Sequence, residues 1–293
     1  MSGATMKLGV SLGANALPAD PRAARDVAQA AEALGLTRLI AADHVLGADP
    51  DRPGGWSGPY THEHLWHEPL VLFGYLAAQT DRIEFMSGIV ILPQRQTALV
   101  AKQAAELDVL SGGRFLLGVG VGWNAVEYQA LGQPFHRRGA RMDEQIALLR
   151  ALWAKENVSF EGRFEHVVRA GINPRPSRGD IPIWMGGHSD AALDRVGRAG
   201  DGWYPLFDDP ALVAPGRERI ARAARAAGRE PERIGVQGRV VLTGAVEEQV
   251  AAARGWRDAG VDMLLLGTTP GVSEPDQHIA ALTAFVDTWR AEP

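Results

Sequence analysis

Short apolar segments alternate with longer amphipathic segments along almost the whole chain of 293 residues. The apolar segments have the length and composition of buried strands, and the amphipathic segments have helical periodicity. The predicted strands cover 7–12, 37–42, 83–92, 114–120, 181–185, 202–206, 234–242 and 262–266, and the predicted helices cover 21–34, 68–80, 96–110, 138–153, 189–199, 210–227, 246–259 and 276–289. Eight repeated strand–helix units without a Pro/Gly linker favour a single (β/α)8 barrel domain over 1–293. An open doubly wound sheet is the alternative.

Two segments exceed the usual length of a connection in such a fold. The first, 45–67, follows the second predicted strand, and the second, 157–180, precedes the fifth. Loops that follow barrel strands lie on the catalytic face, so we expect 45–67 to form a lid or pocket wall. We expect 157–180 to be an insertion with a β-hairpin at 158–164, and residues 1–5 to be a disordered tail.

The fourth predicted strand begins with large apolar residues and then has glycine at every second position. Gly118, Gly120 and Gly122 share one face, because side chains alternate along a strand. Glycine inside a strand marks a place where another body approaches the backbone closely. A flat ligand and a crowded corner of a barrel both account for this pattern.

A carboxylate and an imidazole follow the second predicted strand. Asp43 and His44 therefore stand where a barrel places its chemistry, and histidine can exchange a proton with a substrate. Consecutive strand residues face opposite ways, so the two side chains need not share a pocket. The structural alternative is that Asp43 caps the loop and His44 is a hydrogen-bonded packing residue.

Two glycines separate the fifth predicted strand from the helix after it. Gly186, Gly187 and His188 leave backbone N–H groups at a helix N-terminus, which suits a phosphate group. A tight turn with Ser189 as the N-cap is the structural alternative. Trp203, at the end of the next strand, either lines the same pocket or packs in the core.

The histidines of 45–67 suggest a metal site, which would make the protein a metal hydrolase. His62, His64 and His67 lack the spacing of a helical zinc site, and they fall in a Gly/Pro-rich loop. A pocket wall that includes Tyr60 and Trp66 is favoured over a metal centre.

Composition excludes several other classes. The net charge is −5 with no basic stripe, so nucleic acid is not an expected partner. The chain has no cysteine, which excludes thiolate chemistry and cysteine-held metals. No signal peptide and no apolar run of about 20 residues is present, so we expect a cytoplasmic protein without a membrane partner.

Several of these segments together resemble the bacterial luciferase-like flavin/deazaflavin oxidoreductase superfamily, and within it the coenzyme F420-dependent group of actinobacteria. The matching segments are 42–45 (Ala-Asp-His-Val), 88–95, 101–114, 117–123 (Leu-Gly-Val-Gly-Val-Gly-Trp), 182–187 and 200–205. They occur in the order typical of the family and cover most of 6–245. The resemblance implies a (β/α)8 barrel and a flavin or deazaflavin at the carboxyl ends of its strands.

The resemblance also assigns roles to residues. It implies a non-proline cis peptide in the third strand, at Ile89–Val90 or else at Gly88–Ile89, which backs the cofactor ring. His44 matches the histidine beside the reactive ring and is the catalytic candidate. The implied cofactor-binding residues are Asp43, His44, Gly88, Ile89, Val90, Gly120, Gly122, Trp123, Gly186, Gly187 and His188. This role favours the ligand explanation for the glycines of the fourth strand.

One position departs from the family pattern. Sugar-phosphate dehydrogenases of the family have a catalytic glutamate after these glycines, where this chain has Trp123 and Asn124. A sugar-phosphate substrate is therefore not expected. The predicted substrate pocket comprises Tyr60, Trp66, Trp123, Asn124 and Trp203.

The sequence thus predicts an F420-dependent oxidoreductase that moves a hydride between the deazaflavin and a small organic substrate. The first alternative is a monooxygenase that uses reduced FMN and oxygen, and the second is a cofactor-binding protein without catalysis. The family also suggests a homodimer.

Overall fold

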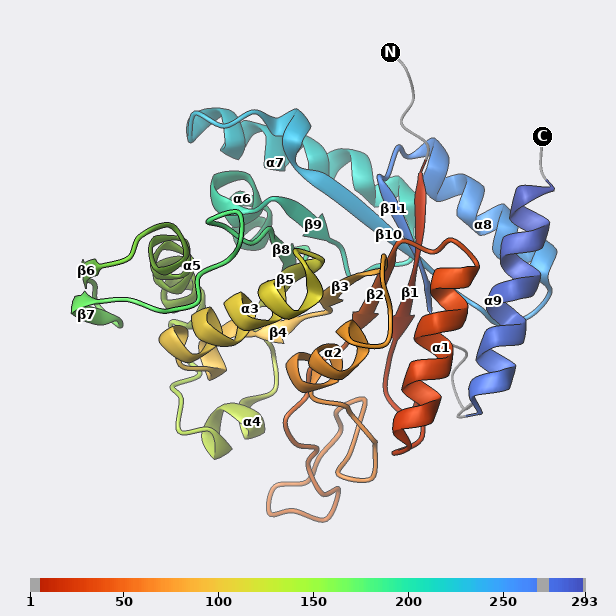
Figure 1. Cartoon of the computed structure of the whole chain (residues 1–293), viewed down its shortest axis with the longest axis horizontal. Coiled ribbons are helices and arrows are strands. Elements are labelled where there is room, and N and C mark those ends of the chain that lie inside the picture. Colours follow the sequence, from red (N-terminus) through yellow and green to blue (C-terminus); the bar gives the residue numbers. More distant parts are fainter. Residues whose placement is uncertain (1–5, 268–273, 292–293) are drawn as a thin grey trace.

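The computed structural model describes residues 6–267 and 274–291 and shows a closed parallel β-barrel surrounded by helices (Figure 1). The predicted tail, 1–5, lies outside the described residues. The barrel strands are β1 (Lys7–Leu12), β2 (Arg38–Ala41), β3 (Glu84–Ser87) with β4 (Val90–Ile91), β5 (Phe115–Gly120), β8 (Ile183–Gly186), β9 (Gly202–Tyr204), β10 (Gly235–Val241) and β11 (Met263–Gly267). β3 and β4 are two parts of one barrel strand, and the β3–β5 pairing at Phe85 and Phe115 closes the ring. The fold prediction is confirmed.

The helices surround this barrel, and their ends follow local sequence signals. They are α1 (Pro21–Ala33), α2 (Pro69–Ala77), α3 (Thr97–Ser111), α4 (Ala125–Ala130), α5 (Arg138–Ala154), α6 (Asp190–Ala199), α7 (Val213–Ala226), α8 (Val246–Asp258) and α9 (Pro275–Arg290). The Asp20 side chain caps α1, and Gly112 ends α3 in the left-handed conformation. α4 is the helix that the sequence pattern did not predict. Within the described parts of the chain, no helix is both long and apolar enough to cross a membrane.

The hairpin of the insertion is longer than predicted. It pairs β6 (Val158–Glu161) with β7 (His166–Ala170), so it spans 158–170 rather than 158–164, and it projects beside α5 (Figure 1). The carboxylate of Glu144 on α5 accepts hydrogen bonds from the backbone N–H groups of 163–165, which places the turn there. That contact lies outside the hairpin, so the local pattern did not reveal it.

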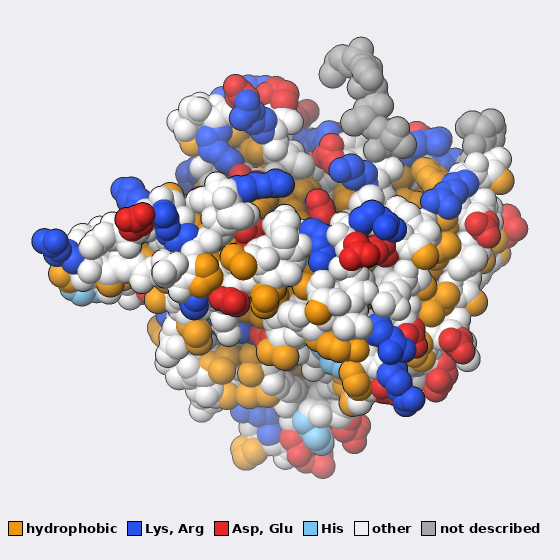
Figure 2. Space-filling view, viewed as in Figure 1, with side chains coloured by type: hydrophobic (Ala, Val, Ile, Leu, Met, Phe, Trp, Pro, Cys, Tyr) orange, Lys and Arg blue, Asp and Glu red, His pale blue; other side chains and the backbone are white. Residues whose placement is uncertain are grey.

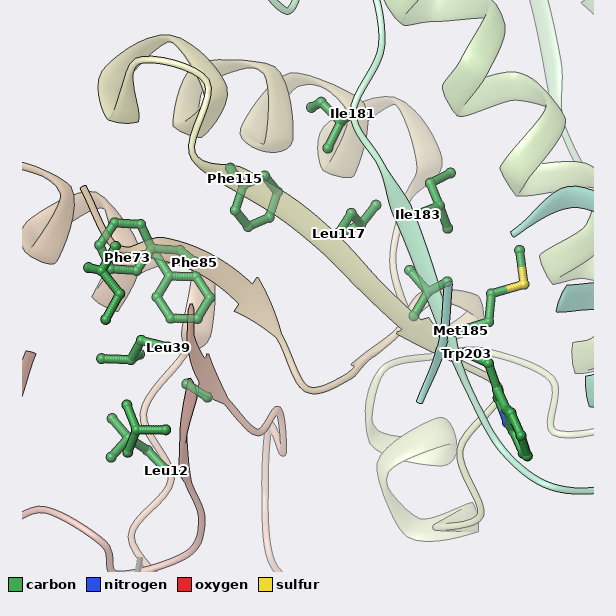
Figure 3. Packing of buried hydrophobic residues seen from close by; sticks show 14 of the residues in the cluster. Leu12, Leu39, Phe73, Phe85, Phe115, Leu117, Ile181, Ile183, Met185 and Trp203 are labelled. Carbon is green, nitrogen blue, oxygen red and sulfur yellow. The ribbon is translucent and has the colours of Figure 1, made fainter. Parts of the chain in front are cut away.

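Buried side chains form two layers. The outer layer lies between the strands and the helices, where Phe73 of α2 packs against Phe85 of β3 with ring centroids 5.4 Å apart (Figure 3). The inner layer fills the barrel and comprises Ile40, Met86, Leu116, Trp184, Tyr204, Met263 and Leu265, with Ile89 packed against it. Acidic and basic side chains are interspersed over the face shown in Figure 2.

The neighbouring strand packs against the face of β5 that carries the glycines. A Cβ atom at Gly118 would overlap the carbonyl oxygen of Ser87, and one at Gly120 would overlap the side chain of Ile89. The Ser87 hydroxyl also donates to the Gly118 carbonyl at 2.8 Å and accepts from its N–H at 3.0 Å. The bodies that approach these two glycines are therefore Ser87, the last residue of β3, and Ile89, which follows it, whereas the sequence predicted a ligand there.

The segment between β3 and β4 contains the non-proline cis peptide. It lies at Gly88–Ile89, so the preferred placement at Ile89–Val90 is wrong by one residue and the alternative placement is confirmed. Val90 instead resumes the strand and pairs with Val119 of β5.

Substitution of Gly118 by alanine tests the close approach of the two strands. We expect Gly118→Ala to lower the free energy of unfolding by about 1–3 kcal/mol, because a backbone oxygen must move to admit the methyl group. The matched control is Gly74→Ala in α2, where the new methyl group makes an ordinary 3.8 Å contact with Leu107. The control should leave stability unchanged or raise it by up to about 1 kcal/mol. Equal effects of the two substitutions in urea unfolding would contradict this account.

Candidate active site

A cavity of about 380 Å³ opens at the carboxyl ends of β2, β4, β5 and β8. Most of the predicted cofactor-binding residues line it: Asp43, His44, Gly88, Ile89, Gly122, Trp123, Gly186, Gly187 and His188. Val90 and Gly120 do not. Val90 is fully buried, and Gly120 is covered by Ile89. The segment between β3 and β4 thus presents Gly88 and Ile89 to the cavity, and β5 lies behind it.

His44 is held by a buried glutamate from α4. Both carboxylate oxygens of Glu127 lie 3.3 Å from His44 Nδ1, and the Glu127 side chain is 1% exposed. One of these oxygens also accepts the backbone N–H of Val45 at 2.9 Å and that of Leu46 at 3.4 Å. Burial raises the pKa of Glu127, but the hydrogen bonds from His44, Val45 and Leu46 outweigh it and leave the pKa below its usual value.

The contact with Glu127 favours one tautomer of His44. An ionised carboxylate can only accept hydrogen bonds, so it favours a proton on Nδ1, and the Tyr60 oxygen 2.7 Å from Nδ1 can accept a hydrogen bond from the same N–H. The Nε2 atom then carries a lone pair. Because His44 lines the cavity and its Nδ1 atom is occupied, Nε2 is the ring nitrogen left to meet a ligand. This arrangement suits a proton acceptor.

Tyr60 and Asn124 support the same histidine rather than line the cavity. The Tyr60 hydroxyl lies 2.7 Å from His44 Nδ1 and accepts a hydrogen bond of 2.7 Å from the amide of Asn124. Both residues are buried, and burial raises the pKa of Tyr60 above its usual value. Neither of these predicted substrate contacts lines the cavity, and their hydrogen bonds connect them to His44 instead.

Aromatic side chains from 45–67 cover His44 and reach the end of β5. Trp66 contacts the His44 ring edge-on at 4.7 Å between centroids. Trp56 stacks on Trp123 at 5.8 Å with an interplanar angle of 21°. Trp123 lines the cavity, whereas Trp56, Tyr60 and Trp66 lie behind it and His44, so the role of 45–67 as a pocket wall stays a prediction.

Asp43 is buried and paired with a cation behind the cavity wall. Arg95 donates to its carboxylate at 2.8 Å and lies 3.0 Å from Glu68, the N-cap of α2. Burial raises the pKa of Asp43, and the Arg95 guanidinium opposes that rise. Asp43 and His44 both line the cavity, although they are consecutive residues.

The turn after β8 supplies the opposite wall. Gly187 has a φ of +121°, a conformation that side chains rarely adopt, and the Ser189 hydroxyl caps α6 through the N–H of Ala192 at 3.3 Å. The expected N-cap is thus present beside the glycines. Trp203 lies elsewhere: it is buried in the outer layer (Figure 3), and its indole N–H donates to the Gly187 carbonyl at 2.8 Å. Trp203 therefore does not line this cavity, but it does line the neighbouring cavity between α6 and α7.

The loop histidines do not gather around a common point. The N–H of Thr61 donates to His64 Nδ1 at 3.1 Å. Among the described residues, no group of three or more His, Asp or Glu side chains is placed to hold a metal ion. The geometry gives the metal-hydrolase alternative no support.

Three residues of this site were missed from the sequence: Glu127, Trp56 and Arg95. Glu127 stands three residues after Asn124, the N-cap of α4, and this spacing is also that of a helix capping box. The Asn124 side chain does cap α4, whereas the Glu127 carboxylate turns to His44. The sequence signal that could have indicated Glu127 was its place as a glutamate shortly after the end of a barrel strand.

Known proteins resemble this chain in sequence. A family model described as luciferase-like monooxygenase matches residues 4–284. An uncharacterized protein of Mycobacterium tuberculosis (strain H37Rv) is 36% identical over 209 residues, which cover 69% of this chain and 72% of that protein. The FMNH2-dependent dimethylsulfone monooxygenase of Pseudomonas putida is 32% identical over 186 residues, or 62% of this chain and 51% of that enzyme.

Solved structures share the fold at low sequence identity. The monooxygenase RslO1 from Streptomyces bottropensis aligns with a TM-score of 0.78 at 22% identity, covering 96% of this chain and 98% of its own. An F420-dependent secondary alcohol dehydrogenase aligns with a TM-score of 0.81 at 16% identity, covering 97% and 99%. Both likenesses support the barrel and its closure.

Substitution of Glu127 by glutamine tests the buried carboxylate. The folded-state pKa of Glu127 is lowered, so its charge stabilises the fold above the usual pKa of about 4.5, and this contribution is lost as the pH falls through the folded-state value. We expect Glu127→Gln to lower the free energy of unfolding by about 1–3 kcal/mol at pH 7. The difference from the unsubstituted protein should shrink below pH 4.5 in urea unfolding.

The control is Glu161→Gln on the exposed hairpin, where the side chain is 80% exposed. It should change stability by less than about 0.5 kcal/mol. A pH-independent effect of Glu127→Gln would show that shape, rather than charge, makes Glu127 important.

Proposed function

Because the chain belongs to the luciferase-like monooxygenase family and is an oxidoreductase, we propose that it is F420-dependent and moves a hydride between the deazaflavin and a small organic substrate. The observation that carries the proposal is the cavity-facing His44 held by the ionised Glu127. Hydride transfer that interconverts an alcohol and a carbonyl also requires a proton to move at the substrate oxygen. His44 Nε2 is the group in the cavity suited to that proton.

The cavity fits a flat ring system with an anionic end. Gly88 and Ile89 form an apolar wall, and Gly186 and Gly187 present backbone without side chains. The N-terminus of α6 begins beside these glycines, and the N–H groups of its first turn that the Ser189 side chain does not accept suit a phosphate. When bound, a deazaflavin accepts or donates a hydride at a substrate carbon.

The protein accepts and returns the proton of this reaction. In the oxidation of an alcohol, the O–H bond breaks and His44 Nε2 takes the proton as the carbonyl forms. Glu127 stabilises the resulting imidazolium through Nδ1, and Tyr60 and Asn124 hold the ring in place. In the reverse direction His44 returns the proton to the oxygen.

The segment 45–67 completes the site. Its aromatic side chains cover one side of the His44 ring, which reduces the contact of that side with water. Glu127 also binds the first backbone N–H groups of this segment, so the same carboxylate positions both the lid and the histidine.

A second candidate function is an FMN-dependent monooxygenase. The observation that favours it is the 32% identity to the dimethylsulfone monooxygenase of Pseudomonas putida, whose name includes FMNH2. A cavity with a flat apolar wall accepts either ring system, so the cofactor must be identified directly.

Titration of the purified protein with each cofactor discriminates the two functions. We expect F420 to bind at least about tenfold more tightly than FMN, with a perturbed visible spectrum. Tight binding of FMN without affinity for F420 would refute the proposal and support the monooxygenase. Absence of binding for both would refute a cofactor role for this cavity.

Substitution of His44 by asparagine tests its role in catalysis. We expect His44→Asn to lower kcat about 10²- to 10⁴-fold, because the proton acceptor is lost, while the Kd for the cofactor stays within about threefold. The control is His166→Asn on the exposed hairpin, which should leave both quantities unchanged. Retained turnover in His44→Asn would rule out His44 as the proton acceptor.

A further inference from the structure

Four aromatic side chains form a contiguous wall of rings beside the cavity, and one of them, Trp123, lines it. Trp56, Tyr60 and Trp66 come from the lid segment, and Trp123 comes from the end of β5. Tyr60 contacts all three others, with ring centroids 5.4–6.3 Å apart. The wall therefore joins 45–67 to the chain that follows β5.

Trp123 is the member of this wall that a ligand can reach. It lines the cavity, yet 48% of its surface is exposed, which is unusual for so large an apolar side chain. Trp56 stacks on it nearly parallel at 5.8 Å, so one ring face is occupied by the lid. A half-exposed tryptophan in a concave site is typical of a binding anchor.

The backbone on both sides of Trp123 is fixed, so its ring is a positioned surface. Gly122 has a φ of +62°, and its carbonyl accepts a hydrogen bond of 3.1 Å from Arg138. Asn124 is buried and caps α4 while it donates to Tyr60. A rigid aromatic surface binds a flat partner with little loss of conformational entropy.

The charges of the cavity disfavour an acidic substrate. Its described lining residues include no lysine or arginine. Arg95 is paired with Asp43 and Glu68, and Arg138 donates to backbone carbonyls while it covers the ring of Phe135. A substrate carboxylate or phosphate near Trp123 would lose its hydration without gaining a free cation.

On this basis we propose that the substrate is a planar, uncharged aromatic molecule that stacks on the free face of Trp123, with its reacting oxygen directed to His44. This inference rests on the proposed function, because it names the substrate class for the same site. Aromatic pairs prefer stacked or edge-on geometries, and the half-exposed ring of Trp123 in the cavity allows either. Ile89 and Leu206 supply apolar contact around it.

Three matched alcohols test the inference. Benzyl alcohol is planar and uncharged, 4-(hydroxymethyl)benzoate adds a negative charge to the same ring, and cyclohexylmethanol has a similar size without a flat ring. Binding to the cofactor-free protein is measured by ligand-observed NMR, and kcat/KM is measured with F420. We expect benzyl alcohol to bind about tenfold more tightly than either competitor, and its kcat/KM to exceed theirs by a similar factor.

Substitution of Trp123 identifies the surface responsible. Trp123→Ala should weaken binding of benzyl alcohol about fivefold to tenfold and raise KM more than it lowers kcat, whereas Trp123→Phe should stay within about threefold of the unsubstituted protein. Circular dichroism establishes that both variants are folded. Unchanged affinity in a folded Trp123→Ala, or a preference for the charged or the non-planar alcohol, would overturn the inference.

The two proposals fail in different ways. If the binding preference and its dependence on Trp123 hold but no alcohol is oxidised with F420, the substrate class stands and the proposed reaction is wrong. If F420-dependent turnover occurs with the opposite preference, the reaction stands and the substrate class is wrong.

Discussion

The close contact between β5 and the segment that joins β3 to β4 shapes the whole site. Gly118 and Gly120 have no side chains, so Ser87 and Ile89 can pack directly against the backbone of β5. The strand is thereby displaced at the point where the barrel ends, and Gly88 and Ile89 become a wall of the cavity. With larger residues in β5 the barrel could not close in this way, and the flat apolar wall would be lost.

The buried carboxylate of Glu127 connects parts of the site that lie far apart in the sequence. It binds the imidazole after β2 and two backbone N–H groups at the start of 45–67, and it comes from α4 after β5. A charge in such a position is stable because each oxygen is hydrogen-bonded. One side chain therefore contacts both His44 and the first two residues of 45–67, which couples the position of the imidazole to the start of that segment.

The strands and most helices could be predicted because hydrophobic periodicity is local, and Asp20 or Gly112 marks a helix end regardless of the fold. The site could be predicted only in part. His44, Gly186 and Gly187 stand at strand ends, whereas the contact of Glu127 with His44 joins residues 83 positions apart. Glycines mark a close approach without identifying the approaching body, which explains why Gly120 was expected to face a ligand and instead faces Ile89. Side chains alternate along a strand, so each one faces either the inside of the barrel or the surrounding helices. The sequence did not show which of the two sides Trp203 would take, and in the structure it faces the helices.

The central claim is that one cavity, walled by Gly88–Ile89 and faced by His44, holds both the cofactor ring and the reacting oxygen of the substrate. A crystal structure of the protein with F420 bound tests it most directly. The account predicts the deazaflavin ring against Ile89, the phosphate at the Gly186–Gly187 turn, and Nε2 of His44 directed at the space beside the ring. A cofactor bound instead in the neighbouring cavity between α6 and α7, which Trp203 and Arg222 line, would contradict it.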